Sequence, residues 1–276
     1  MTASLVIAGT LVSAGAYATG WLRLARRARH APPATWRLAA AMAALAAVAV
    51  ALASPLAALA HERFSAHMVQ HLLLLTVAAP LVLLADPFPV MLWALPPRAR
   101  AAFRGPFGRD GVCRRALVTV TWLPVAWLVS SAVVWLWHLP ALYEWALASE
   151  SAHVVEHVAL LAAAILYWWP LLDPAPRVRG RAHPGGAVAY VVLGAFQAAA
   201  LGLTLILWPT PLYPSYAGPG REPVDDQALG GVLMWAVTAV VDMAAVMALV
   251  WRFLAKAPRA GLRSAAPTAV PTRRVS

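Results

Sequence analysis

Seven apolar runs, each long enough to cross a lipid bilayer, dominate this sequence. They cover residues 3–22, 36–60, 67–93, 116–137, 152–171, 186–208 and 228–252. A helix of about 20 residues spans the hydrocarbon core and satisfies its own backbone polar groups there. The composition, with 62% hydrophobic and 12% charged residues, also fits a chain surrounded by lipid. We therefore expect an all-α fold, a polytopic membrane helix bundle with seven transmembrane helices.

The basic residues predict how this bundle is oriented. Of the 22 Lys and Arg residues, all but Arg63 and Arg221 lie in alternate loops or after the last run. Lys and Arg remain on the cytoplasmic side of a membrane, so we expect the N-terminus outside and the C-terminus in the cytoplasm. The same clusters account for the net charge of +11 without a nucleic-acid partner. We expect one transmembrane bundle domain over residues 1–256 and a disordered cytoplasmic tail over 257–276, which is rich in Ala, Pro and Arg.

Five histidines fall at the outer end of the expected bundle. His67 and His71 open the third run, His138 closes the fourth, and His153 and His157 open the fifth. A spacing of four residues puts both members of a pair on one helix face, about 6 Å apart along the axis. Imidazole binds copper, zinc, iron and nickel, and ionisable residues in a membrane are costly unless they serve a function. The histidines therefore predict a shared metal or cofactor site.

Five further residues are candidates for an accessory role. Glu156 could orient a liganding imidazole through its other ring nitrogen. Asp225 and Asp226 begin the last run, where they could cap a helix or attract a cation. Met234 could offer sulfur to copper, or simply fill the core. Asp242 lies inside the last run, where a carboxyl group either makes a structural hydrogen bond or serves a function.

Other motifs narrow the kind of activity. The sequence contains no nucleotide-binding loop and no Ser-His-Asp arrangement, and its single cysteine, Cys113, offers no thiol metal motif. We expect a protein that handles a metal and is not an enzyme. Copper handling at the outer face is one interpretation. The alternatives are a copper importer or channel running past Asp242, Met243 and Met247, and a membrane cytochrome with haem between His71 and His157.

Four segments carry a resemblance to a known family. They are FSAHMVQHLLLLTVAAPLVLL (64–84), WHLPALYEWALASESAHVVEHVALLAAAILYWWP (137–170), PLYPSYA (211–217) and DDQALGGVLMW (225–235). Together they resemble the CtaG family of bacterial cytochrome c oxidase assembly proteins, over about residues 36 to 254. The family's histidine motifs fall on His67, His71, His138, His153 and His157, and its acidic motif falls on Asp226 and Gln227.

The resemblance implies a multi-pass protein of the bacterial cytoplasmic membrane that helps a caa-type terminal oxidase to mature. Its implied partners are the oxidase subunits and extracytoplasmic copper chaperones, and its implied cargo is copper. We expect copper to pass Asp225 and Asp226, to be held by the two histidine pairs with His138 nearby, and to move on to the oxidase. A metal-free scaffold that holds oxidase subunits together is the remaining alternative.

Overall fold

The structure, a computed structural model, describes residues 3–27, 33–180, 182–218 and 222–255. The helices are α1 (Ala3–Arg27), α2 (Thr35–Ala53), α3 (Pro55–Ala60), α4 (Phe64–Leu72), the π-helix η1 (Leu73–Ala78), α5 (Ala79–Leu84), α6 (Pro87–Ala94), α7 (Pro97–Ala102), α8 (Arg104–Phe107), α9 (Val112–Val120), α10 (Leu123–Trp137), α11 (Pro140–Ala148), α12 (Glu150–Leu172), α13 (Pro184–Leu207), the 3-10 helix η2 (Pro214–Tyr216) and α14 (Pro223–Leu254). No strand occurs within the described ranges, so the all-α expectation is confirmed for them. Arg221 and the predicted tail 257–276 lie outside the described residues.

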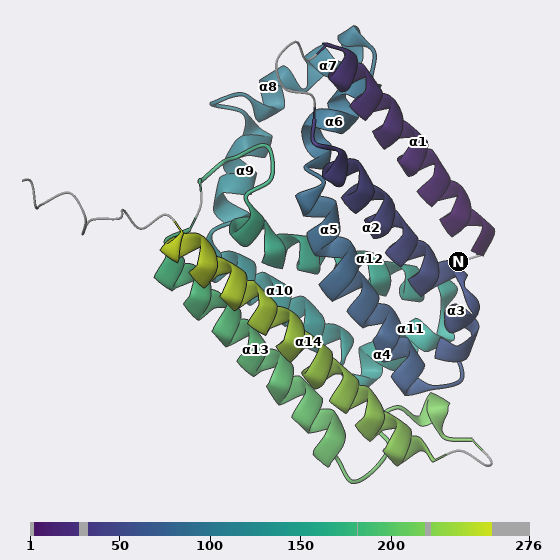
Figure 1. The fold of residues 1–276 in the computed structure, drawn as a ribbon. Helices are drawn as coiled ribbons and strands as arrows, with labels where there is room; N and C mark the ends of the chain where they lie inside the picture. The colour runs from purple at the N-terminus through teal and green to yellow at the C-terminus, as the bar shows by residue number, and fades with distance from the viewer. Residues whose placement is uncertain (1–2, 28–32, 181, 219–221, 256–276) are drawn as a thin grey trace, which may run out of the picture.

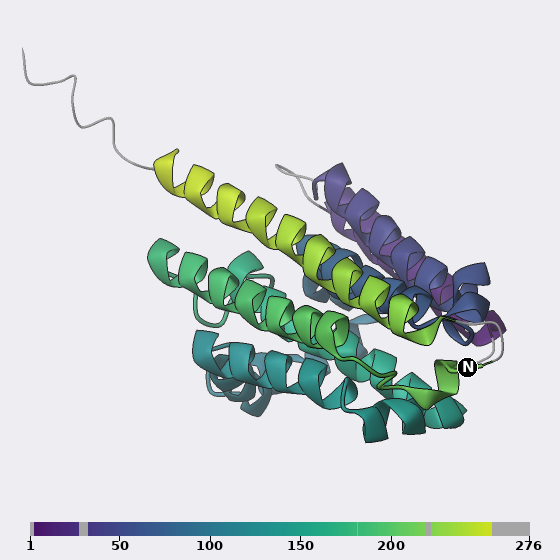
Figure 2. The ribbon, with the colours of Figure 1, turned by 90° about the horizontal axis from the view of Figure 1, so that it is seen from below.

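The long helices run beside one another in a bundle (Figures 1 and 2). Six of them are long and apolar enough to cross a membrane, with α4, η1 and α5 together forming one span. The pair α9 and α10, bent by 77°, makes a seventh when it is counted as one span. The expected run 116–137 is therefore not one straight helix. Pro124 lies in the first turn of α10, a position where proline is tolerated, because the missing N–H has no partner there.

Two of the predicted runs are longer than the helices that form. The run 36–60 breaks at Ser54, whose extended backbone precedes Pro55 as expected for a residue before proline. The run 67–93 breaks at Asp86, which adopts a left-handed backbone with φ 53°. The Asp86 carboxylate accepts hydrogen bonds from Arg37 Nη1 at 2.9 Å and from Ala175 N at 2.7 Å. Helix α6 thus turns away from the third span and packs on α1.

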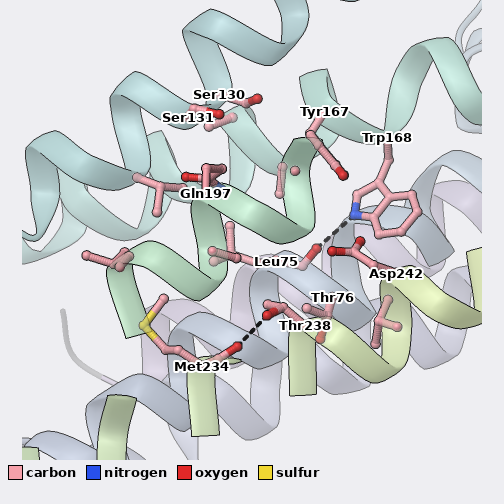
Figure 3. A pocket seen from close by; sticks show the side chains of 17 residues that line it. Leu75, Thr76, Ser130, Ser131, Tyr167, Trp168, Gln197, Met234, Thr238 and Asp242 are labelled. Atoms are coloured by element: carbon pink, nitrogen blue, oxygen red, sulfur yellow. Dashed lines mark hydrogen bonds between the residues drawn. The ribbon is translucent and has the colours of Figure 1, made fainter. Parts of the chain in front are cut away.

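A π-helical turn in the third span follows from Pro80. In the π register Ala79 N donates to Leu74 O, so the next amide would donate to Leu75 O. Pro80 has no N–H and leaves that carbonyl free. Trp168 Nε1 on α12 donates to Leu75 O instead, at 3.0 Å (Figure 3). This hydrogen bond joins the third span to α12, well past the residues at which the two begin, Phe64 and Glu150.

Small residues allow α14 to approach α13 closely. A Cβ atom on Gly231 would lie 2.6 Å from Gly202 O, and one on Gly202 would lie 2.9 Å from Gly231 O. Close backbone packing through small residues is typical of membrane helices. The first half of α14 also packs against α4. Helices α3, α11 and the start of α4 gather at one end of the bundle, and α7 to α9 lie at the other (Figure 1).

Candidate metal centre

Helices α4 and α12 bring the two histidine pairs face to face. The ring centroids of His67 and His153 lie 5.1 Å apart, and those of His71 and His157 lie 5.3 Å apart. His67 also faces His157, with a centroid distance of 5.5 Å. Both helices begin at the same end of the bundle, so their i, i+4 spacings match turn for turn. The two pairs that the sequence suggested are thus one cluster.

Backbone carbonyls fix the orientation of two imidazoles. His138 Nδ1 lies 2.7 Å from Val134 O, and His157 Nδ1 lies 3.0 Å from His153 O. A carbonyl only accepts, so each Nδ1 carries the proton and each Nε2 keeps its lone pair for a ligand. Burial lowers the pKa of His138, which caps the C-terminal end of α10, so this ring is neutral.

Tyr216 orients the His67 ring in the same sense. Its hydroxyl donates to Ala60 O at 3.1 Å, so the oxygen accepts from His67 Nδ1 at 3.0 Å. Burial raises the pKa of Tyr216, which keeps the phenol protonated. Tyr143 supports this hydroxyl from 3.2 Å. His67 Nε2 is therefore free to bind a metal.

The nitrogens that face the centre of the cluster are buried and without hydrogen-bond partners among the described residues. They are the Nε2 atoms of His67, His71, His138, His153 and His157, together with His71 Nδ1. Both carboxylate oxygens of Glu156 are equally buried and unpartnered. Buried polar atoms are normally paired, so these donors and acceptors together are candidate ligands for a metal ion.

The ligand atoms form two overlapping groups, each with its atoms within 4.8 Å of one another. One group contains His67, His71 and His157, and the other contains His67, His153 and Glu156. Neutral imidazoles with a carboxylate suit copper, zinc or iron. The sequence suggested that Glu156 orients a liganding imidazole, and its oxygens lie 3.6 Å from the Nε2 atoms of His67 and His71. Because its carboxylate belongs to the second group of ligand atoms, Glu156 is also a candidate ligand.

The two aspartates at the start of α14 lie beside the centre. Asp226 accepts hydrogen bonds from Ser65 N at 3.3 Å and from the Ser65 hydroxyl. This contact caps the first turn of α4, two residues before His67, from a different helix. Asp225 belongs to a hollow of about 440 Å³ above the centre, and the hollow is lined by Glu62, Arg63, Tyr216, Glu222, Pro223, Asp225, Asp226 and Leu229.

The family of the chain follows from its sequence profile. Residues 15–256 match the profile of the cytochrome c oxidase caa3 assembly factor family (Caa3_CtaG). The chain belongs to this family. The resemblance to CtaG proteins is confirmed, and the matched range includes all five histidines, Glu156 and Tyr216. No curated protein and no solved structure matches the chain.

Not every candidate residue of this caa3 assembly factor lies among the histidine ligands. His138 belongs to neither group of ligand atoms, although its ring centroid lies 5.7 Å from that of His71. Met234 packs with Phe64, Met68 and three tyrosines beside the centre. It also lines a separate cavity of about 80 Å³. Within the described residues we therefore place His138 at the edge of the centre and Met234 in its packing.

Asp242 lies in that second cavity, about 24 Å beyond Asp226 along α14 at 1.5 Å per residue. The polar residues that line this cavity (Figure 3) are Thr76, Ser130, Ser131, Tyr167, Gln197, Thr238 and Asp242. None of the five candidate histidines lines it. Met243 and Met247 are 62% and 65% exposed on the outer surface of the bundle, so they do not continue a path from Asp242.

Two residues that contact His67 were not assigned a role from the sequence. Tyr216 lies in PLYPSYA, a segment that carried the family resemblance without a role for its tyrosines. Tyr143 lies in α11, between the fourth and fifth predicted runs. Both tyrosines lie in segments that carried the family resemblance, which marked the segments but not the side chains. The contacts of these side chains with His67 are known only from the fold.

Proposed function

We propose that this protein binds copper at the histidine centre and delivers it to the caa3 oxidase during assembly. The observation that carries the proposal is the cluster that His67, His71, His153 and His157 form with Glu156, in two groups whose ligand atoms lie within 4.8 Å of one another. Imidazole and carboxylate ligands hold copper without the closed thiolate cage that makes a site inert. Such a centre suits a protein that must release its cargo.

We further propose that the histidine end of the bundle faces the outside of the cytoplasmic membrane. The Arg-containing helices α7 and α8 lie at the opposite end (Figure 1). Arg23, in the last turns of α1, donates to Ala94 O at 2.8 Å and so belongs to that end as well. Basic residues stay on the cytoplasmic side, which supports an N-terminus outside and a C-terminus inside.

The hollow lined by Asp225 and Asp226 is the proposed route by which copper reaches the centre. Among the residues that the structure describes, four carboxylates line it, from Glu62, Glu222, Asp225 and Asp226, and one arginine, Arg63. An excess of negative charge raises the local concentration of cations. Tyr216 lines the hollow and contacts His67, so the hollow adjoins the ligands directly.

The two alternatives with a transported ion or haem find less support in the geometry. A copper channel through Met243 and Met247 conflicts with the outward exposure of both side chains. A haem held by His71 and His157 needs space for its macrocycle between the two rings. A nitrogen of His67 lies within 4.8 Å of ligand atoms of both, in the space the macrocycle would need.

The test compares the protein with its double variant His67→Ala, His71→Ala in cells that make the caa3 oxidase. Copper is measured by elemental analysis in the detergent-purified protein and in the purified oxidase. We expect copper in the wild-type protein, none in the double variant, and an oxidase that lacks copper in the variant cells. A visible spectrum of the purified protein is recorded in parallel, and a Soret band would support a haem protein instead.

The control is His183→Asn. His183 is an exposed residue between α12 and α13, at the end of these helices that is far from the histidine centre. His183 Nδ1 accepts from Gly185 N at the start of α13, and asparagine preserves that cap. We expect this variant to match the wild type in both copper measurements. An oxidase with full copper in the double-variant cells would contradict the proposal and favour a metal-free scaffold.

A further inference from the structure

We propose that the histidine centre holds two metal ions, with the Glu156 carboxylate as a bridge between them. This inference rests on the proposed function, in which the bound metal is copper. The first observation is the number of donors: five imidazole Nε2 atoms and two carboxylate oxygens are buried without partners at one place. A single four-coordinate ion would leave several of them unsatisfied.

The donors are arranged in two layers. His67 and His153 form the layer nearer the start of the helices, and His71 and His157 form the layer one turn deeper. Along the helix axes the two layers are about 6 Å apart, but the rings lean together, with centroids 4.6 Å apart for His67 and His71 and 4.5 Å apart for His153 and His157. The ligand atoms nevertheless form two groups and not one: His67, His71 and His157 in one, and His67, His153 and Glu156 in the other. Two ions can therefore take donors that one four-coordinate ion would leave unsatisfied.

Glu156 faces the two layers with different oxygens. Its Oε2 lies 3.6 Å from His67 Nε2, and its Oε1 lies 3.6 Å from His71 Nε2. A carboxylate chelating one ion points both oxygens at the same place. Here each oxygen faces a different imidazole, which is the arrangement of a carboxylate bridging two ions, as found in two-metal sites with ions about 3.5–4 Å apart.

The ligand groups assign each ion its residues. His67, His153 and Glu156 form one group, which supplies the first ion. His67 belongs to both groups of ligand atoms, but with its Nδ1 engaged by Tyr216 it has one nitrogen to give, Nε2, which we assign to the first ion. His71 and His157 then remain for the second ion, together with Glu156 Oε1 and with His138, whose ring lies 5.7 Å from that of His71. The cargo of this protein is on this basis a pair of copper ions.

The test loads the purified full-length protein with copper(II) chloride, removes excess metal, and measures copper per chain and the spin count by electron paramagnetic resonance. We expect two copper ions per chain and a spin count well below the copper content, because a bridging carboxylate couples the two spins. Glu156→Gln has nearly the same size and removes the bridging charge. We expect its remaining copper to give a spin count equal to its copper content.

Two single variants separate the layers. His153→Ala and His157→Ala each should retain one copper ion per chain with a full spin signal, and thermal unfolding checks that both are folded. One copper ion per wild-type chain, or a full spin count from two, would overturn the inference and leave the proposed copper function intact. No copper in the folded wild-type protein would instead reject the proposed function, and this inference with it.

Discussion

Two polar regions lie within this apolar bundle, the histidine centre at the end where α4 and α12 begin and the Asp242 cavity further along α14. Both contain buried carboxylates, Glu156 in the first and Asp242 in the second. Glu156 faces imidazole nitrogens at 3.6 Å, whereas Asp242 shares its cavity with hydroxyl and amide groups. The centre therefore combines side chains that could hold a metal ion, and the cavity combines Asp242 with neutral hydrogen-bonding groups.

The difference shows what an ionisable residue in a membrane span does and does not indicate. Both carboxylates are costly to bury as charges, yet only Glu156 has several unpartnered nitrogens around it. The Asp242 cavity, at about 80 Å³, has room for a few water molecules, which polar groups of this kind can hold. We expect copper chemistry in the first region and none in the second.

The largest effect is expected from removing two ligands of the centre. His67→Ala with His71→Ala should lower copper affinity more than about 100-fold, because loss of a group that only orients a ligand already costs about 10–100-fold. Competition with a chromophoric chelator measures the affinity in the purified protein. An affinity within a few-fold of the wild type would remove the distinction between the two regions.

A smaller loss should follow from Tyr216→Phe. This change removes the hydroxyl that holds His67 Nδ1 and leaves the ring free to rotate. We expect copper affinity to fall by about 10–100-fold, the range for groups that orient a metal ligand. Tyr190→Phe is the matched control, because the Tyr190 hydroxyl donates to Tyr167 O, outside the centre. Equal losses in both variants would point to general destabilisation.

The sequence predicted the parts of this fold and centre that depend on local pattern. Apolar runs gave the spans, because length and hydropathy alone decide whether a helix can cross a membrane. The spacing of His67 and His71 gave a shared face, because helix periodicity is local. The breaks at Ser54 and Asp86 depend on single residues within long apolar runs, so a search for apolar runs did not predict them.

Other features depend on contacts between helices and had no local signal. The surroundings of Glu156 depend on where α12 lies relative to α4, so the sequence could not predict that its two oxygens lie 3.6 Å from His67 and His71. Tyr216 reaches His67 from η2, a short helix far along the chain. The sequence left Asp242 open between a structural hydrogen bond and a functional role, because a sequence shows depth along a helix and not the neighbours of a side chain.

A change beside the Asp242 cavity, at Trp168, should affect stability and leave copper binding unchanged. Trp168→Phe removes the donor to Leu75 O, the carbonyl that Pro80 leaves free. We expect it to lower the free energy of unfolding by about 1 kcal/mol, as for hydrogen bonds between membrane helices, with copper affinity unchanged. Trp169→Phe is the control, because Trp169 Nε1 has no partner among the described residues. The measurement is unfolding by denaturant in detergent micelles.

The smallest effect on copper is expected at Asp242. Asp242→Asn keeps the size of the side chain and removes its charge, so the cavity should remain filled. We expect copper affinity and copper per chain within about twofold of the wild type, since the residue is about 24 Å from Asp226 along the helix. A loss of copper in Asp242→Asn as large as that in His67→Ala, His71→Ala would show that both regions take part in copper binding. It would support the channel hypothesis.

The most direct test of the central claim is X-ray absorption at the copper edge of the purified, copper-loaded protein. The account predicts a first shell of nitrogen and oxygen ligands near 2.0 Å, with the outer-shell scattering of several imidazole rings. The same measurement on His67→Ala, His71→Ala should show that signal lost. A shell dominated by sulfur, or one without imidazole scattering, would place copper elsewhere and contradict the histidine centre.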